Sequence, residues 1–121
     1  AVVVPRHGAA GLGPTVSKVA AGAAESLPFA AVANVGRVLD WFADYGITRV
    51  GTSDQAPRSL YDAALDGHLA LVMGREETGL GKAVAARCDQ LASLPMEGRV
   101  SSLNVSVAAG ICLFETLRQR R

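Results

Sequence analysis

The stretch LPMEGRVSSLNVSVAAGICLFE, residues 94–115, joins two segments with opposite structural preferences. Its first half is rich in Pro, Gly, Ser and Asn, which favour turns and helix caps over helix interiors. Its second half has apolar residues at helical spacing on more than one side. These residues are Val105, Ala108 and Cys112 on one side, and Val107, Ile111 and Phe114 on another. The sequence therefore predicts a turn-rich segment and then a helix from Asn104 to about Arg120, buried on more than one side.

Two interpretations of this helix remain open from its pattern alone. A plain core helix would pack only against its own sheet, whereas burial around most of the circumference would favour contact with a second subunit as well. Gly110 lies within the helix, where glycine is a poor helix former that is usually kept for close packing. Ser101 or Ser102 is a candidate cap for the helix start.

Strand-like and helix-like segments alternate along the chain. Short apolar runs rich in Val, Ile and Leu predict buried strands, and a 3.6-residue apolar repeat predicts helices. The expected strands are 1–5, 29–32, 47–52, 69–74 and 90–96, and the expected helices are 14–24, 35–45, 59–66, the second part of 74–88, and 104–120. Asn34 is the expected cap of the second helix. This order predicts an α/β domain with a mainly parallel sheet and helices on both faces.

Composition narrows the possible classes of protein. The chain has 121 residues, of which half are hydrophobic and 19% are charged, and its net charge is +1. One folded domain is expected, and the charge alone does not favour nucleic-acid binding. Cys88 and Cys112 form no metal or disulfide pattern, so we expect no metal and reduced thiols in a cytoplasmic protein. No apolar run is long enough for a membrane span, and the abrupt opening strand AVVVP suggests missing upstream residues.

Three loops are the candidate ligand-binding positions. Ligands of parallel α/β sheets bind beyond the carboxyl ends of the strands, which points to the loops after Val50, Met73 and Leu94. The first, GTSD at 51–54, reads on its own as an ordinary turn in which Thr52 offers a hydroxyl.

The second loop, LVMGREETGLGK at 71–82, has the strand, glycine-rich loop and helix order of phosphate-binding sites. It fails both the P-loop and the dinucleotide patterns, because Glu76 stands where each requires glycine. Its acidic pair also disfavours a pyrophosphate. The loop instead suits a ligand with a positive centre, or one held by hydrogen bonds.

The segments LALVMGREETGLG and LPMEGRVSSLNVSVAAGICLFE strongly resemble motifs 2 and 3 of the SpoU (TrmH-like) class of the SPOUT RNA methyltransferases. KVAAGAAESLP at 18–28 is similar to a segment of the branch that methylates guanosine 2'-oxygens in 23S rRNA. The resemblance covers essentially the whole chain. It implies an α/β domain with a C-terminal deep trefoil knot (the SPOUT fold), an exception to the usual absence of knots. It also implies S-adenosylmethionine as cofactor and a homodimer formed through the C-terminal helix region.

The resemblance assigns roles to individual residues. Gly74, Leu94, Met96 and Leu103 are expected to hold the adenosine and methionine parts of the cofactor, largely through backbone groups and apolar packing. Thr52 is expected beneath the adenine. The residues that match the polar positions around the reacting centre, and so are the catalytic candidates, are Glu76, Ser102 and Asn104.

One family feature is missing from the sequence. Motif 1, an Asn followed by an Arg, is expected before AVVVP, and no arginine of the chain lies in that context. We therefore expect residues 1–121 to be a SPOUT methyltransferase catalytic domain without motif 1 and without an N-terminal RNA-binding domain, and inactive alone. The expected function is methyl transfer to a guanosine 2'-OH of 23S rRNA. The alternatives are a tRNA 2'-O-methyltransferase, a fragment that binds cofactor and dimerises without transfer, and, disfavoured by the failed motifs, a nucleotide-binding oxidoreductase or ATPase.

Overall fold

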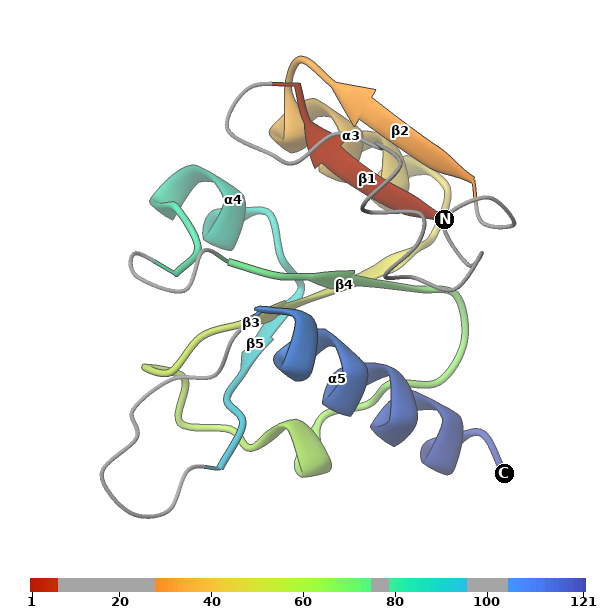
Figure 1. Ribbon diagram of the computed structural model, residues 1–121, viewed down its shortest axis with the longest axis vertical. Helices are drawn as coiled ribbons and strands as arrows, with labels where there is room; N and C mark the ends of the chain where they lie inside the picture. The colour runs from red at the N-terminus through yellow and green to blue at the C-terminus, as the bar shows by residue number, and fades with distance from the viewer. Residues whose placement is uncertain (7–27, 75–78, 96–104) are drawn as a thin grey trace. The chain divides into compact units, whose positions relative to one another are not determined.

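The computed structural model describes residues 1–6, 28–74, 79–95 and 105–121. They belong to two compact units, Ala1–Val38 and Leu39–Arg121 (Figure 1). The helix expected at 14–24 lies outside the described residues.

The first unit holds a parallel pair of strands. β1 (Val2–Pro5) pairs with β2 (Phe29–Val32) so that Val2 lies opposite Phe29 and Pro5 opposite Val32. Both strands form where the apolar runs predict them. The burial predicted for them is wrong, because Val2 is 41% exposed and Val3 is 36% exposed.

The helix α3 (Val35–Asp44) begins in the first unit and continues into the second. The side chain of Asn34 accepts a hydrogen bond from the backbone N–H of Arg37 at 3.1 Å, which confirms the predicted cap. The helix ends before Gly46, whose φ of 74° is a left-handed value that glycine adopts without steric cost.

A parallel sheet of three strands forms the centre of the second unit, in the order β4-β3-β5. Its strands are β3 (Thr48–Thr52), β4 (Leu69–Val72) and β5 (Gln90–Ala92). β3 ends at Thr52, as the apolar run predicts, whereas β4 and β5 end two and four residues earlier than predicted. Every strand pairing in the described residues is parallel, as the alternating pattern predicts.

Helices cover both faces of this sheet. Successive residues of β3 point to opposite faces, so neighbouring residues contact different helices or the segments next to them. Val50 is fully buried on the side of α5 (Val105–Gln119), and Gly51 faces the segment that leads into α4 (Lys82–Ala86) (Figure 1). The buried core on the α5 side consists of Val50, Leu60, Ala63, Leu65, Ala92 and Cys112. The α/β prediction with helices on both faces is confirmed for this unit.

The helix predicted at 59–66 is much shorter in the structure. Only η1 (Leu60–Asp62), a single 3-10 turn capped by Ser59, forms there. The backbone on either side of the turn is bonded to other elements: Leu60 donates its N–H to the carbonyl of Ser93 at 2.7 Å, and Leu65 donates to the side chain of Gln119. These tertiary hydrogen bonds replace the i→i−4 bonds of a longer helix.

None of the helices in the described part of the chain combines the length and the apolar character that a membrane crossing needs.

Candidate functional site

The carboxyl ends of the three strands of the second unit meet at one edge. Gly51 of β3 lies opposite Val72 of β4, and Thr52 lies opposite Ala92 of β5. The next residue, Ser53, donates its N–H to the carbonyl of Ala92 at 2.9 Å. The loops that the sequence singles out after β3, β4 and β5 therefore start side by side.

Thr52 is the last residue of β3, and its side chain lies beside the end of β4. Its hydroxyl is half-buried and 3.5 Å from the carbonyl oxygen of Val72, and it lies 4.0 Å from the sulfur of Met73. A distance of 3.5 Å is longer than that of a strong O–H···O bond. The hydroxyl therefore retains capacity for a stronger partner, such as a polar group of a ligand.

Gly74 brings the next loop back against the end of β4. A Cβ at this position would lie 2.4 Å from the carbonyl carbon of Gly79 and 2.5 Å from the nitrogen of Leu80. Both are backbone atoms, so no side-chain rotation could relieve the contact. Only glycine allows this approach, and it leaves main-chain groups of two loop segments at the edge of the sheet.

Leu94 leaves β5 at the same edge. It is half-buried and packs against the core on the α5 side. Ser93, just before it, is held by the 58–60 segment, because it donates its N–H to the carbonyl of Arg58 at 2.8 Å and its own carbonyl accepts from Leu60. The structure therefore places Thr52, Gly74 and Leu94 at one edge of one sheet.

The other predicted site residues, Glu76, Met96, Ser102, Leu103 and Asn104, lie outside the described residues. Their roles stay predictions.

The described edge suits a ligand held by backbone groups and apolar packing. It offers the hydroxyl of Thr52, which makes no short hydrogen bond, and the apolar side chains of Met73 and Leu94. It also offers the close backbone approach at Gly74, where a Cβ would clash. These features fit the adenosine and methionine parts of S-adenosylmethionine. Within the described ranges, no three His, Cys, Asp or Glu side chains gather as a metal-ligand set.

An ion pair that sequence reasoning missed lies toward the opposite, amino-terminal edge. Arg49 donates to Asp89 from its guanidinium and from its backbone N–H, each at 2.8 Å. The backbone hydrogen bond is the main reason why the pKa of Asp89 is lowered. Arg87 forms a second pair nearby with Asp40 of α3. No spacing pattern signals these pairs, since their members are far apart in the chain.

Burial, rather than nearby charge, is the main cause of the pKa shifts of the two thiols. Desolvation raises the pKa of both Cys88 and Cys112. For Cys88 the neighbouring Arg49 opposes this shift without cancelling it. Both cysteines are free, so they act as apolar packing groups.

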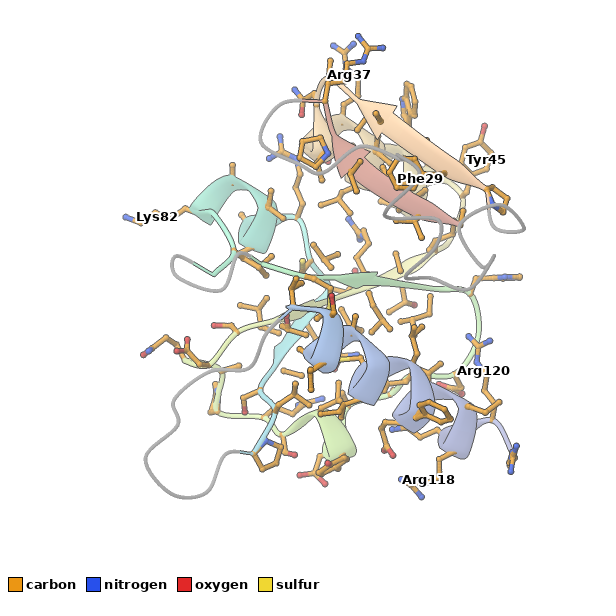
Figure 2. All side chains as sticks on the ribbon, in the orientation of Figure 1. Phe29, Arg37, Tyr45, Lys82, Arg118 and Arg120 are labelled. Carbon is orange, nitrogen blue, oxygen red and sulfur yellow. The ribbon has the colours of Figure 1, made fainter. Side chains whose placement is uncertain are left out.

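The predicted burial of α5 on more than one side is wrong for the single chain. Ala108 and Cys112 are buried against the sheet, but Val107 is 52% exposed and Phe114 is 75% exposed. The reason is that no described element covers that side of the helix. An open groove lies there between α5 and Tyr61 of η1. Figure 2 shows Arg118 projecting from the outer side of α5 near the C-terminus.

The described sheet, with helices on both faces and the close backbone approach at Gly74 beside its carboxyl edge, defines an α/β protein with a candidate ligand-binding edge built mainly from main chain. The chain belongs to the SpoU rRNA Methylase family, which matches residues 1–114. The resemblance inferred from motifs 2 and 3 is thereby confirmed.

Curated relatives carry a more specific name. The 23S rRNA (guanosine-2'-O-)-methyltransferase RlmB of Photorhabdus laumondii is 51% identical to this chain, and that of Escherichia coli K12 is 50% identical, each over 120 residues. These alignments cover 99% of this chain and 49% of each relative. The chain thus spans about half the length of the curated relatives it matches.

Solved structures share the fold. The SpoU methyltransferase AviRb from Streptomyces viridochromogenes, in complex with AdoMet, matches 98% of this chain and 49% of its own with a TM-score of 0.87 and 33% identity. The TrmH/SpoU tRNA modifying enzyme from A. aeolicus matches 86% of this chain and 53% of its own with a TM-score of 0.79 and 30% identity.

Proposed function

We propose that the chain is the cofactor-binding catalytic domain of an S-adenosylmethionine-dependent methyltransferase that acts on a guanosine 2'-oxygen of 23S rRNA. The observation that carries the proposal is the edge where Thr52, Gly74 and Leu94 meet. It lies at the loops that motifs 2 and 3 occupy, in a chain about 50% identical to enzymes named for this reaction.

Described residues would hold the cofactor in two ways. The backbone brought together by Gly74 would supply hydrogen-bonding groups, and Leu94 would supply an apolar wall. Thr52 would contribute its hydroxyl beneath the adenine. By motif, Met96 and Leu103 complete this set. A site of this kind recognises shape and hydrogen-bonding pattern rather than phosphate charge, which agrees with the acidic loop.

The catalytic part of the proposal rests on three polar residues identified by motif. Glu76, Ser102 and Asn104 are assigned to the reacting centre, where they would orient the ribose hydroxyl and one of them would accept its hydrogen bond. S-adenosylmethionine, when bound, supplies a methyl group made electrophilic by its sulfonium. The carboxylate of Glu76 would accept the hydroxyl proton, which would make the 2'-oxygen a better nucleophile. The bond from the sulfonium sulfur to the methyl carbon would break as the bond from the 2'-oxygen forms, and S-adenosylhomocysteine would leave.

The assembly is also part of the proposal. We infer a homodimer through the exposed apolar side of α5, because Leu113 is 60% exposed and Phe114 75% exposed beside the groove at Tyr61. Exposed apolar patches of this kind mark contact surfaces. The family resemblance supports a C-terminal trefoil knot, and a ribosomal RNA substrate is consistent with a cytoplasmic location.

A second candidate is 2'-O-methylation of tRNA. It is supported by the similarity to the A. aeolicus tRNA modifying enzyme, at 30% identity, and to a structure described as bearing on 2-OH methylation of C/U34 on tRNA, at 27% identity. Both identities are well below the 50% found with the RlmB relatives, so 23S rRNA is the preferred substrate.

The test is methyl transfer with labelled S-adenosylmethionine. The chain is incubated separately with 23S rRNA and with tRNA, and ribose methylation is identified by resistance of the adjacent phosphodiester to alkaline hydrolysis. Calorimetric titration with S-adenosylhomocysteine is run on the same preparation, with ATP and NAD as control ligands.

Each outcome decides between the functions. Label in 23S rRNA at a guanosine supports the proposal, and label in tRNA alone supports the second candidate. Binding of S-adenosylhomocysteine without transfer to either RNA would favour a chain that binds cofactor and lacks catalytic groups such as motif 1. Binding of ATP or NAD instead would contradict the cofactor assignment.

A further inference from the structure

Gly51 of β3 lies under the loop that Gly74 shapes. A Cβ on Gly51 would lie 2.7 Å from a methyl carbon of Leu80, 2.8 Å from one of Leu91 and 2.9 Å from the sulfur of Cys88. These distances are shorter than real Cβ contacts, so something would have to move. The bare backbone of Gly51 is therefore the surface against which Leu80 is seated.

Leu80 connects this surface to the cofactor edge. Its side chain contacts Gly51, while its backbone nitrogen is one of the atoms that a Cβ on Gly74 would strike. One residue thus packs against two glycines, at the ends of two neighbouring strands. The depth to which the Leu80 side chain sinks onto β3 sets how close the 79–81 segment comes to the end of β4.

We propose that Gly51 is a positioning residue for the cofactor loop: by lacking a side chain it seats Leu80, and through Leu80 it holds residues 79–81 against Gly74. This inference rests on the proposed function, since it takes the loop to hold S-adenosylmethionine. Gly51 itself does not touch the cofactor in this proposal.

The three neighbours of Gly51 differ in how easily they can move. Leu91 belongs to β5 and lies directly opposite Gly51 in the parallel ladder. Cys88 is tied to α4, because its thiol donates to the carbonyl of Val84 at 3.5 Å. Leu80 lies in an irregular segment before α4. A methyl group added at Gly51 would therefore be accommodated chiefly by displacement of Leu80 and its loop.

The experiment compares Gly51→Ala with the double variant Gly51→Ala/Leu80→Val. Calorimetric titration with S-adenosylhomocysteine is expected to show binding weakened about tenfold or more in the single variant, the effect of overpacking that moves a binding loop. Shortening Leu80 is expected to restore affinity to within about threefold of wild type. Gly110→Ala is the matched glycine control, because nothing lies within 4 Å of a Cβ there and Gly110 belongs to α5 rather than to the 79–81 segment.

A second readout needs no ligand. Amide hydrogen exchange over residues 79–85 includes the bond from the N–H of Ala85 to the carbonyl of Gly81, which anchors the loop to α4. Exchange is expected to be faster in Gly51→Ala and to return to the wild-type rate in the double variant. Urea unfolding of each variant shows how much global stability has changed.

Three results separate the inference from the proposed function. Wild-type affinity and exchange in Gly51→Ala would overturn the inference alone. Rescue by Leu91→Val that equals rescue by Leu80→Val would also overturn it, since the defect would then be general sheet packing. A wild-type chain that binds no S-adenosylhomocysteine would overturn the cofactor assignment, while the exchange experiment would still show whether Gly51 positions the loop.

Discussion

Gln119, near the end of α5, donates a hydrogen bond from its side-chain nitrogen to the carbonyl oxygen of Ala63 at 3.0 Å. Its side-chain oxygen accepts a hydrogen bond from the N–H of Leu65 at 2.9 Å. One amide thus satisfies two backbone groups of the irregular segment after η1, in the way that a neighbouring strand would. Because Leu65 and Ala63 are both buried, this contact fixes α5 to the core.

Gln119→Ala is expected to lower the free energy of unfolding by about 1–3 kcal/mol, because two buried backbone groups lose their partners. Urea unfolding followed by circular dichroism measures the change. Gln55→Ala, at an exposed loop glutamine, is the matched control and should leave stability within about 0.5 kcal/mol of wild type. An equal loss in both variants would show that the Gln119 bonds do not stabilise the fold.

The lowered pKa of Glu115 predicts that the stability of the fold depends on pH. Hydrogen bonds from Arg118 and then Gln119 lower the pKa of this carboxyl from 4.5 to about 2 in the folded chain. A depressed folded pKa stabilises the fold above the unfolded value. The contribution is therefore complete above about pH 4.5 and is lost as the pH falls toward 2.

Glu115→Gln is expected to remove this part of the acid dependence. The difference in unfolding free energy between wild type and variant should shrink as the pH falls from about 4.5 to about 2. Asp54→Asn, at an exposed loop carboxylate, serves as the control. Urea unfolding at a series of pH values measures both, and a difference that stays constant across this range would contradict the prediction.

Gly74→Ala should impair cofactor binding more severely than Thr52→Ala, which removes only a side chain. Its Cβ would meet backbone atoms of Gly79 and Leu80, so the loop itself has to move. We expect S-adenosylhomocysteine affinity to fall at least about tenfold, as titration calorimetry would show. Gly110→Ala is again the control, and amide exchange confirms that the rest of the sheet remains folded. Unchanged affinity in Gly74→Ala would remove the motif 2 loop from the site.

Phe114→Asp tests the proposed dimer. A charge in the middle of the exposed apolar side of α5 should convert a dimer to a monomer, because burying an unpaired carboxylate is strongly unfavourable. Light scattering coupled to gel filtration measures the mass. Tyr45→Asp is the control, at an aromatic side chain that is 81% exposed and distant in sequence from α5. A wild-type chain that is monomeric throughout the tested concentrations would argue against the dimer.

The strands and the capped helix could be predicted from local sequence. The apolar runs placed β1 to β5, and Asn34 placed the start of α3, because burial and capping depend on residues close together in the chain. The motifs likewise pointed to Thr52, Gly74 and Leu94, which meet at one edge because parallel strands end together.

What could not be predicted depends on partners distant in sequence. The helix expected at 59–66 is short because Ser93 and Gln119 bond its backbone from elsewhere. The exposed side of α5 could not be distinguished from a core surface, since Phe114 is apolar in either case. The pairing of Arg49 with Asp89 has no local signal at all.

The placement of the ion pairs has a practical consequence for protein engineering. In the described ranges, Arg49–Asp89 and Arg87–Asp40 fasten β3, α3 and the turn after α4 on the side away from Thr52 and Gly74. The two ends of the strands therefore differ: these ion pairs lie toward the amino-terminal ends, and the loops proposed to hold the cofactor follow the carboxyl ends. Substitutions in the loops at the carboxyl ends of the strands are therefore expected to change cofactor affinity while these two ion pairs stay in place.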